Sequence, residues 1–474
     1  MSFVSFTFAA FFAAVLVLRI VLDRLPRREP WIMVLVVASL VFYAWNVPWH
    51  LALLLLLAIV GYWAGRVIGD LPPRSPSARA AVGCAVAIGL GILGFFKYAD
   101  YLAGVGAAFG GVLGFDATPP TRLGLVLPLG ISFYTFEMIS YAVDVYRGRL
   151  VSTRRWRHFL LFLAFFPHLI AGPIVRAGDF LYQIDRRRRP RLRVMSEGVY
   201  LLIRGFFLKV VVADNLAPVV DAHWALASAP GASASLGVLV AVLFGFQILC
   251  DFDGYSTIAR GAAYLLGFRL PVNFDSPYVA RTFREFWQRW HITLSRWLRD
   301  YLYVSLGGNR VGRWRLHLNL LIVMALGGLW HGAANTFLVW GLLHGTALVV
   351  ERILGLHRLS ERGPVVARVL WWVVVQTTVL IAWVFFRAGS VEQATTLVGN
   401  VRAGSFAALP STVSPGWTLA LLAVPVAGHL RSLAQERFGL PHPSPTEKAV
   451  WAAMMLYAAC TTYGPSKTFI YFQF

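Results

Sequence analysis

Two histidines in the second half of the chain are the side chains best suited to acid–base chemistry. His291 lies beside the aromatic face of an expected amphipathic helix, and His331 lies within an apolar stretch. A histidine loses its hydration among apolar residues, so it is retained there when it is paired, bound or working. A neutral imidazole can take a hydroxyl proton near neutral pH, so His331, the stronger candidate of the two, could serve as a general base. A structural histidine, hydrogen-bonded between helices, is the alternative for each.

Small and polar residues flank His331. Trp330 and Asn335 are candidate walls of a substrate site. Glycines without a side chain let another segment or a substrate approach the helix closely. These glycines are Gly327, Gly328 and Gly332. The pattern favours a crowded site around His331.

Residues 281–303 predict one amphipathic helix that carries His291. Its apolar residues recur at helical spacing and form one wide aromatic face, and most of its arginines lie on the other side. Tryptophan and arginine together on a short helix are typical of the membrane–water boundary. The sequence therefore predicts an interfacial helix here.

The composition excludes a water-soluble protein. Of the 474 residues, 58% are hydrophobic and 14% are charged, with a mean hydropathy of +0.64, whereas soluble domains have about 25% charged residues. Long apolar runs between short polar turns predict an all-α polytopic membrane protein with roughly a dozen crossings. The net charge of +21 lies mainly in short loops and is first a signal of membrane topology. The three scattered cysteines predict neither disulfides nor a metal site.

Two apolar stretches are predicted to be broken. Residues 123–145 contain Pro128, Gly130 and Glu137, which predict an interrupted helix packed inside protein. Residues 159–174 lie between basic segments at 147–157 and 176–193. If both basic segments face the cytoplasm, the apolar stretch cannot cross and is predicted to be re-entrant. The arginines at 186–189 are either contacts for anionic lipid or a simple cytoplasmic anchor.

The sequence lacks the motifs of nucleotide binding, serine hydrolysis and metalloprotease chemistry. It has no nucleotide-binding glycine loop, no Gly-x-Ser-x-Gly elbow and no His-Glu-x-x-His metal motif. Asp251 and Asp253 form a close carboxylate pair, but no other ligands cluster with them, so no metal is expected. Asp251 is predicted to stand at the end of a membrane span as a cap or an ion-pair partner, with Arg260 nearby.

Short motifs then follow one another in a characteristic order. They are Asp-Phe-Asp-Gly-Tyr-Ser at 251–256, Leu-Gly-Phe-Arg-Leu-Pro-Val-Asn-Phe at 266–274, Glu-Phe-Trp-Gln-Arg-Trp-His-Ile at 285–292, Trp-Leu-Arg-Asp-Tyr-Leu-Tyr at 297–303, Gly-Gly-Asn-Arg at 307–310 and Gly-Leu-Trp-His-Gly at 328–332. Residues 128–134, 172–176 and 469–474 add to the pattern. From residue 127 to the end, the chain resembles the membrane-bound O-acyltransferase (MBOAT) family, in particular its bacterial branch of alginate O-acetylation and teichoic-acid D-alanyl transfer.

The resemblance implies a ring of tilted transmembrane helices around a thin central region, with re-entrant and amphipathic helices. A cytoplasmic donor passage would there meet an outward-facing acceptor funnel. In this family the histidine at His331 is taken as the essential catalytic residue, and His291 is the second implicated position. The residues expected to contact substrates are Trp330, Asn335, Trp290, Ser295, Arg299, Asp300, Tyr301 and Asp251. No metal is expected.

The function that the resemblance implies is O-acetylation of hydroxyls on an exported, alginate-like polysaccharide. The acyl group would come from acetyl-CoA or an acyl-carrier thioester on the cytoplasmic side, with no permanently bound cofactor. Expected partners are the external polysaccharide, membrane lipid and a periplasmic acetyltransferase or secretion complex, but no nucleic acid. The expected location is the bacterial inner membrane. Alternatives are D-alanyl or other acyl transfer to teichoic acid or peptidoglycan, or, in a different class, a non-catalytic conduit or transporter.

One integral-membrane domain is expected over 1–474, with N-terminal spans at 1–122, a catalytic core at 123–350 and C-terminal spans at 351–474. The chain also departs from the family pattern at Asp253, Thr257 and Arg260. The family commonly has a small residue, an acidic residue and an apolar residue at these positions. These departures leave the reaction class intact but leave the acceptor open.

Overall fold

The computed structural model describes residues 1–22, 29–114, 123–170, 172–185, 192–404, 406–465 and 469–470. Within these ranges the secondary structure is helical and no strand occurs, which confirms the predicted all-α class. The arginines at 186–189 and the C-terminal residues 471–474 lie outside the described residues. The chain divides into unit 1, comprising Met1–Val199 with Ala259–Pro271, and unit 2, comprising Tyr200–Ile258 with Val272–Phe474. The expected division at 122 and 350 stays a prediction.

The helices of unit 1 come from the first half of the chain. They are α1 (Phe6–Leu22), α2 (Glu29–Ala44), α3 (His50–Asp70), α4 (Pro76–Val112), α5 (Ile131–Tyr146), α6 (Trp156–Ala164), α7 (Phe166–Leu169) and α8 (Ala177–Asp185). Helix α9 (Leu192–Phe206) begins in this unit and ends in unit 2, whereas α11 (Ala234–Leu266) begins in unit 2 and ends in unit 1.

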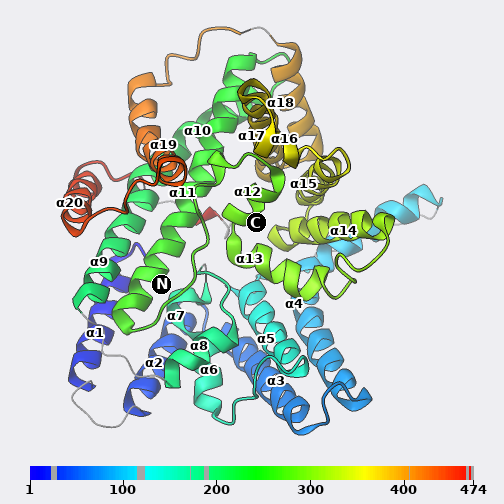
Figure 1. Cartoon of the computed structure of the whole chain (residues 1–474), viewed down its shortest axis with the longest axis vertical. Coiled ribbons are helices and arrows are strands. Elements are labelled where there is room, and N and C mark those ends of the chain that lie inside the picture. The colour runs from blue at the N-terminus through cyan, green and yellow to red at the C-terminus, as the bar shows by residue number, and fades with distance from the viewer. Residues whose placement is uncertain are drawn as a thin grey trace. The chain divides into compact units, whose positions relative to one another are not determined.

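Unit 2 holds both candidate histidines and the remaining helices. They are η1 (Phe207–Ala213), α10 (Asp214–Ala227), η2 (Pro277–Val279), α12 (Phe283–Arg289), α13 (Ile292–Trp297), η3 (Leu298–Tyr303), α14 (Arg313–His331), α15 (Asn335–Ile353), α16 (His357–Arg362), α17 (Val365–Arg387), α18 (Val391–Ala403), α19 (Pro415–Phe438) and α20 (Pro445–Thr461). Helices α14 and α15 lie side by side in Figure 1 and make the most extensive helix pair of the chain.

Six of the described helices are long and apolar enough to cross a membrane: α3, α4, α11, α15, α17 and α19. Helices α1 and α2 are apolar but shorter. The sequence predicts about a dozen crossings. Several of its apolar runs instead form short helices, such as α5 with 16 residues and α6 with 9, and at a rise of about 1.5 Å per residue these are shorter than a typical span.

The expected break in residues 123–145 is confirmed in part. Residues 123–130 are not helical, Gly130 has φ 72°, and a single unbroken helix, α5, begins at Ile131. The buried carboxylate of Glu137 on α5 lies 3.2 Å from His168 Nε2 and accepts the Val175 N–H at 3.0 Å. Glu137 thus satisfies non-helical backbone inside the protein, which explains why a carboxylate is retained there.

The apolar stretch at 159–174 is also interrupted. Helix α6 ends at Ala164, a single turn of helix follows as α7, and residues 173–176 have no regular secondary structure. Pro167 stands in the first turn of α7, where its missing N–H costs no helical hydrogen bond. The expectation that this stretch re-enters the membrane stays a prediction.

Two sequence predictions in unit 2 are wrong. The single amphipathic helix over 281–303 is divided into α12, α13 and η3, because the backbone at His291 adopts φ 40°, which no α-helix contains. Asp251 does not cap a helix, since α11 continues past it to Leu266. The alternative role as an ion-pair partner is confirmed, but its cation is Lys209 at 2.7 Å and not Arg260.

Candidate active site

A tight helical hairpin positions His331. Helix α14 ends at His331, and α15 begins only a few residues later and packs back along it. A side chain at Gly328 would meet the Phe337 carbonyl oxygen, and one at Gly341 would meet the Met324 carbonyl oxygen. Only glycine permits this backbone approach, which brings the end of α14 under the side chains of α15.

Gly332 has a separate role directly after His331. Its backbone is extended, with φ −160°, so the requirement for glycine is one of space and not of conformation. A Cβ at this position would lie 2.1 Å from the Phe337 ring. Phe337 therefore packs over the turn, and His331 is held at the last residue of α14 with 4% of its surface exposed.

His291 is positioned by a clamp around the break between α12 and α13. The side-chain Oδ1 of Asn273 accepts the Thr293 hydroxyl at 2.6 Å, and its Nδ2 donates to the Ser256 hydroxyl at 3.0 Å. The Ile292 N–H donates to the Asn273 carbonyl at 2.9 Å. Asn273 thereby ties the first two residues of α13, directly after His291, to Ser256 on α11 and supports the left-handed conformation of His291. This conformation is uncommon outside glycine and often marks functional sites.

Aromatic rings surround the two histidines. The His331 ring centroid lies near three others, at 5.0 Å from Trp330, 5.0 Å from Trp340 and 5.3 Å from Phe386. The His291 ring lies 4.7 Å from Phe252 and 5.8 Å from Trp330. The centroids of the two histidine rings are 6.4 Å apart. The structure thus brings the two predicted catalytic residues together, with Trp330 touching both.

The surroundings of His291 keep it neutral. The side chain is completely buried, and neither ring nitrogen has a hydrogen-bond partner among the residues that the structure describes. Burial lowers the pKa of this imidazole well below its ordinary value, because the charged form loses its hydration. The segment lies outside the six candidate spans. A neutral imidazole surrounded by apolar side chains offers one donor and one acceptor nitrogen to a reacting molecule.

The other predicted substrate residues are distributed more widely. Trp290 is fully buried behind His291, with its ring 4.9 Å from Phe274 and 4.6 Å from Trp383. Asn335 begins α15 with an exposed side chain. A third group lies on α13 and η3: the Ser295 hydroxyl donates to the Trp290 carbonyl, Arg299 pairs with Asp300 at 2.6 Å, and Tyr301 packs on Trp297. Their roles as substrate contacts stay predictions.

Asp251 belongs to a buried ion-pair cluster and not to the wall around the histidines. Lys209 on η1 is 1% exposed and lies 2.7 Å from both Asp251 and Asp214. The second oxygen of Asp251 accepts the Ile470 N–H at 2.7 Å. Next to it, Phe469 packs on Tyr255 with ring centroids 4.3 Å apart. The cluster therefore anchors the C-terminal segment against α11. Asp251 directly precedes Phe252, whose ring contacts His291.

Sequence reasoning missed several residues of this site. Asn273 occurs near the end of a recognised motif, but its partners Ser256 and Thr293 lie on other elements, 17 and 20 residues away. Trp340 and Phe386 complete the wall around His331 from α15 and α17. His344 is a further fully buried histidine near this site, with its ring stacked on Phe286 at 5.6 Å. Its spacing of one helical turn from Trp340 on α15 is the local signal that could have identified it.

The apolar helices define an integral membrane protein, and the enclosed histidine pair is its candidate active site. Residues 155–383 match the model of the MBOAT, membrane-bound O-acyltransferase family. The chain is 42% identical over 362 residues to the "Probable alginate O-acetylase AlgI" of Azotobacter vinelandii, covering 76% of this chain and 70% of that protein. It is 36% identical over 390 residues to the "Peptidoglycan O-acetyltransferase" of Helicobacter pylori, covering 76% and 71%.

A further relative is the "Teichoic acid D-alanyltransferase" of Streptococcus thermophilus, which is 33% identical over 237 residues, covering 47% of this chain and 56% of that protein. The chain belongs to the membrane-bound O-acyltransferase family. It is an acyltransferase and a multi-pass protein of the bacterial inner membrane.

Proposed function

We propose that this chain O-acetylates hydroxyl groups of an exported, alginate-like polysaccharide. The observation that carries the proposal is the enclosed pair of His331 and His291, with ring centroids 6.4 Å apart. The 42% identity to the alginate O-acetylases of Azotobacter vinelandii and Pseudomonas aeruginosa supports this acceptor class over the other acceptors in the family. The acetyl donor is a thioester on the cytoplasmic side, either acetyl-CoA or an acyl-carrier thioester.

In the proposed reaction His331 is the general base. It removes the proton of the acceptor hydroxyl while the oxygen attacks the thioester carbonyl carbon. The C–O bond forms and the C–S bond breaks, and the departing thiolate takes the proton back from His331. General-base catalysis of this kind contributes about 10²–10⁴-fold to a rate. His291 is the second functional histidine, because its ring is near enough to His331 for one reacting group to contact both.

The aromatic enclosure supports the same chemistry. Trp330, Trp340 and Phe386 keep water from the imidazole of His331. Exclusion of water protects the thioester from hydrolysis and strengthens the polar contacts that form in the transition state. A periplasmic acetyltransferase or a secretion complex is the proposed partner that uses or delivers the acetylated polymer.

The experiment compares His331→Ala with His317→Ala, a matched change on the same helix α14. Both proteins are purified with equal membrane yield, and transfer of labelled acetyl groups is measured with alginate, peptidoglycan and teichoic acid as separate acceptors. We expect transfer to alginate by wild type and His317→Ala, and a loss of at least 100-fold in His331→Ala. Undiminished transfer in His331→Ala would refute the proposed base and favour a non-catalytic conduit.

The acceptor is decided in the same assay. Preferred transfer to teichoic acid or peptidoglycan would refute the alginate-like acceptor while leaving the acyl-transfer chemistry in place. Substituting acetyl-CoA by an acetylated carrier protein in a parallel reaction separates the two proposed donors.

A further inference from the structure

Unit 2 contains a cavity that the proposed reaction does not use. Its volume is about 830 Å³, large enough for part of a lipid-sized molecule. Its wall comes from α9, η1, α11, α19, α20 and the segment 274–277. Neither His291 nor His331 lines it. Phe274 forms part of the wall, and on its other side its ring contacts Trp290 and His291 at centroid distances of 4.9 and 6.4 Å.

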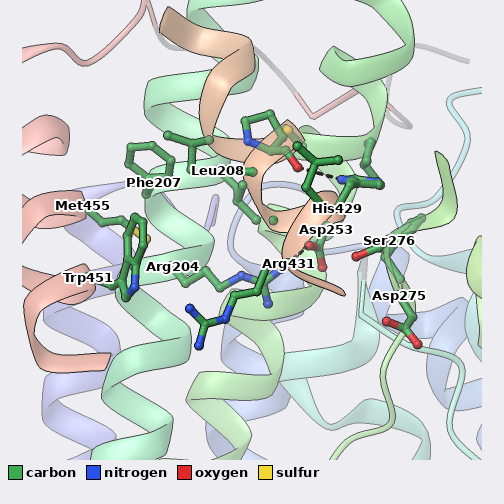
Figure 2. A pocket seen from close by; sticks show the side chains of 18 of the residues that line it. Arg204, Phe207, Leu208, Asp253, Asp275, Ser276, His429, Arg431, Trp451 and Met455 are labelled. Carbon is green, nitrogen blue, oxygen red and sulfur yellow. Dashed lines mark hydrogen bonds and ion pairs between the residues drawn. The ribbon is translucent and has the colours of Figure 1, made fainter. Parts of the chain in front are cut away.

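The cavity has a charged part and an apolar part. Figure 2 shows Arg204 and Arg431 projecting into its middle from different helices. The apolar side chains lie on one side of the arginines in this view, and Asp275 and Ser276 lie on the other. The labelled apolar side chains are Phe207, Leu208, Trp451 and Met455. An occupant that matches this wall is amphiphilic.

The charges of the wall are balanced. Two guanidinium groups, from Arg204 and Arg431, stand with two carboxylates, from Asp253 and Asp275. Arg204 pairs with Asp253 at 2.9 Å, and Arg431 pairs with Glu447 at 3.4 Å. The Nε of Arg431 is buried without a hydrogen-bond partner in the described part of the chain. A purely anionic ligand would meet both carboxylates. A ligand with a phosphate and an ammonium group can satisfy both kinds of charge, since arginine binds phosphate through several N–H groups.

One residue of the cavity wall, Asp253, stands at a position at which this chain departs from its family. The Thr257 hydroxyl donates to Asp253 at 3.0 Å, and Asp253 in turn accepts from Arg204. The network therefore joins two of the positions that differ from the usual family pattern. This connection favours a ligand particular to this chain over one required by the shared transfer reaction.

We propose that this cavity binds a zwitterionic phospholipid with a primary ammonium group. Its phosphate lies between Arg204 and Arg431, and its ammonium lies against Asp275. One acyl chain follows the apolar wall formed by Phe207 and Met455. The lipid touches the histidine site only through Phe274, so it is a bound membrane component and not an acyl donor.

The test uses the full-length protein, purified in detergent and stripped of lipid. Lipid binding is measured by native mass spectrometry and by the shift in Tm, with dioleoyl phosphatidylethanolamine, phosphatidylglycerol and phosphatidylcholine as probes and coenzyme A as a separate arm. We expect phosphatidylethanolamine to bind more tightly than the other two lipids and to raise the Tm most. Neither readout needs acetyl transfer, so the result is independent of the proposed function.

Three variants test the contacts. Arg431→Gln is expected to weaken phosphatidylethanolamine binding at least tenfold, while Arg402→Gln, an exposed arginine on α18, leaves it unchanged. Asp275→Asn is expected to remove the preference for phosphatidylethanolamine over phosphatidylglycerol. Asp275 is exposed at the protein surface, so this variant remains informative if Arg431→Gln fails to fold. Equal binding of all three lipids, binding of coenzyme A in their place, or unchanged binding in Arg431→Gln would overturn the proposal.

Discussion

Replacing Asn273 with alanine tests whether the clamp around His291 is needed for acyl transfer. The side chain is 1% exposed and makes three hydrogen bonds: its Oδ1 accepts the Thr293 hydroxyl at 2.6 Å and the Thr293 N–H at 3.4 Å, and its Nδ2 donates to Ser256 at 3.0 Å. Alanine removes these bonds and leaves two buried hydroxyl groups without this partner. At about 0.5–1.5 kcal/mol for each bond, plus the cost of unsatisfied buried groups, the expected loss of stability is about 2–4 kcal/mol.

The effect on transfer has a separate cause. The backbone at His291 has φ 40°, and such conformations persist where surrounding contacts enforce them. Without the Asn273 side chain, the break between α12 and α13 relaxes and the imidazole moves. A displacement of about 1 Å at a reacting group can cost roughly 10²-fold in rate. We therefore expect kcat for acetyl transfer to fall 10- to 100-fold, with a smaller change in KM.

The matched control is Asn400→Ala. Asn400 on α18 also clamps a turn, since its amide donates to the carbonyls of Ala227 and Ala229 and its carbonyl accepts the Gly231 N–H. Thermal unfolding in detergent reports stability, and transfer is assayed at a temperature at which both variants are folded. We expect similar losses of Tm, but loss of kcat only in Asn273→Ala. Full kcat in Asn273→Ala, or equal loss in both variants, would refute the positioning role.

Two further substitutions test the packing of the site. Gly332→Ala places a Cβ 2.1 Å from the Phe337 ring. We therefore expect it to destabilise the protein by about 1–3 kcal/mol and to reduce acetyl transfer. The control for both measurements is Gly83→Ala, whose added Cβ meets no atom within 4 Å. Lys209→Met leaves Asp251 buried without its cation, so we expect a loss of about 3–5 kcal/mol in the free energy of unfolding. A Tm of Lys209→Met equal to that of wild type would contradict this assignment of the buried ion pair.

The sequence by itself determined the class of protein and its most informative residues. Apolar runs of sufficient length require helices in a membrane, because every backbone polar group must be satisfied within the segment. The Gly-Leu-Trp-His-Gly and Arg-Trp-His motifs then identified His331 and His291 as candidates. The non-helical stretch before α5 was also predictable, since a proline, a glycine and a carboxylate in one apolar run cannot all face lipid.

Only the tertiary structure decided how these residues meet. Helical periodicity predicted an unbroken helix through His291, because the side-chain pattern does not record the backbone turn that Asn273 supports. Local sequence also suggested Arg260 as the partner of Asp251, whereas Lys209 from another helix lies within 2.7 Å. Contacts between different elements fixed the clamp, the ion pair and the wall of the cavity. Spacing along one helix carries no information about which other helix packs against it, and for this reason the site's geometry had to come from the fold.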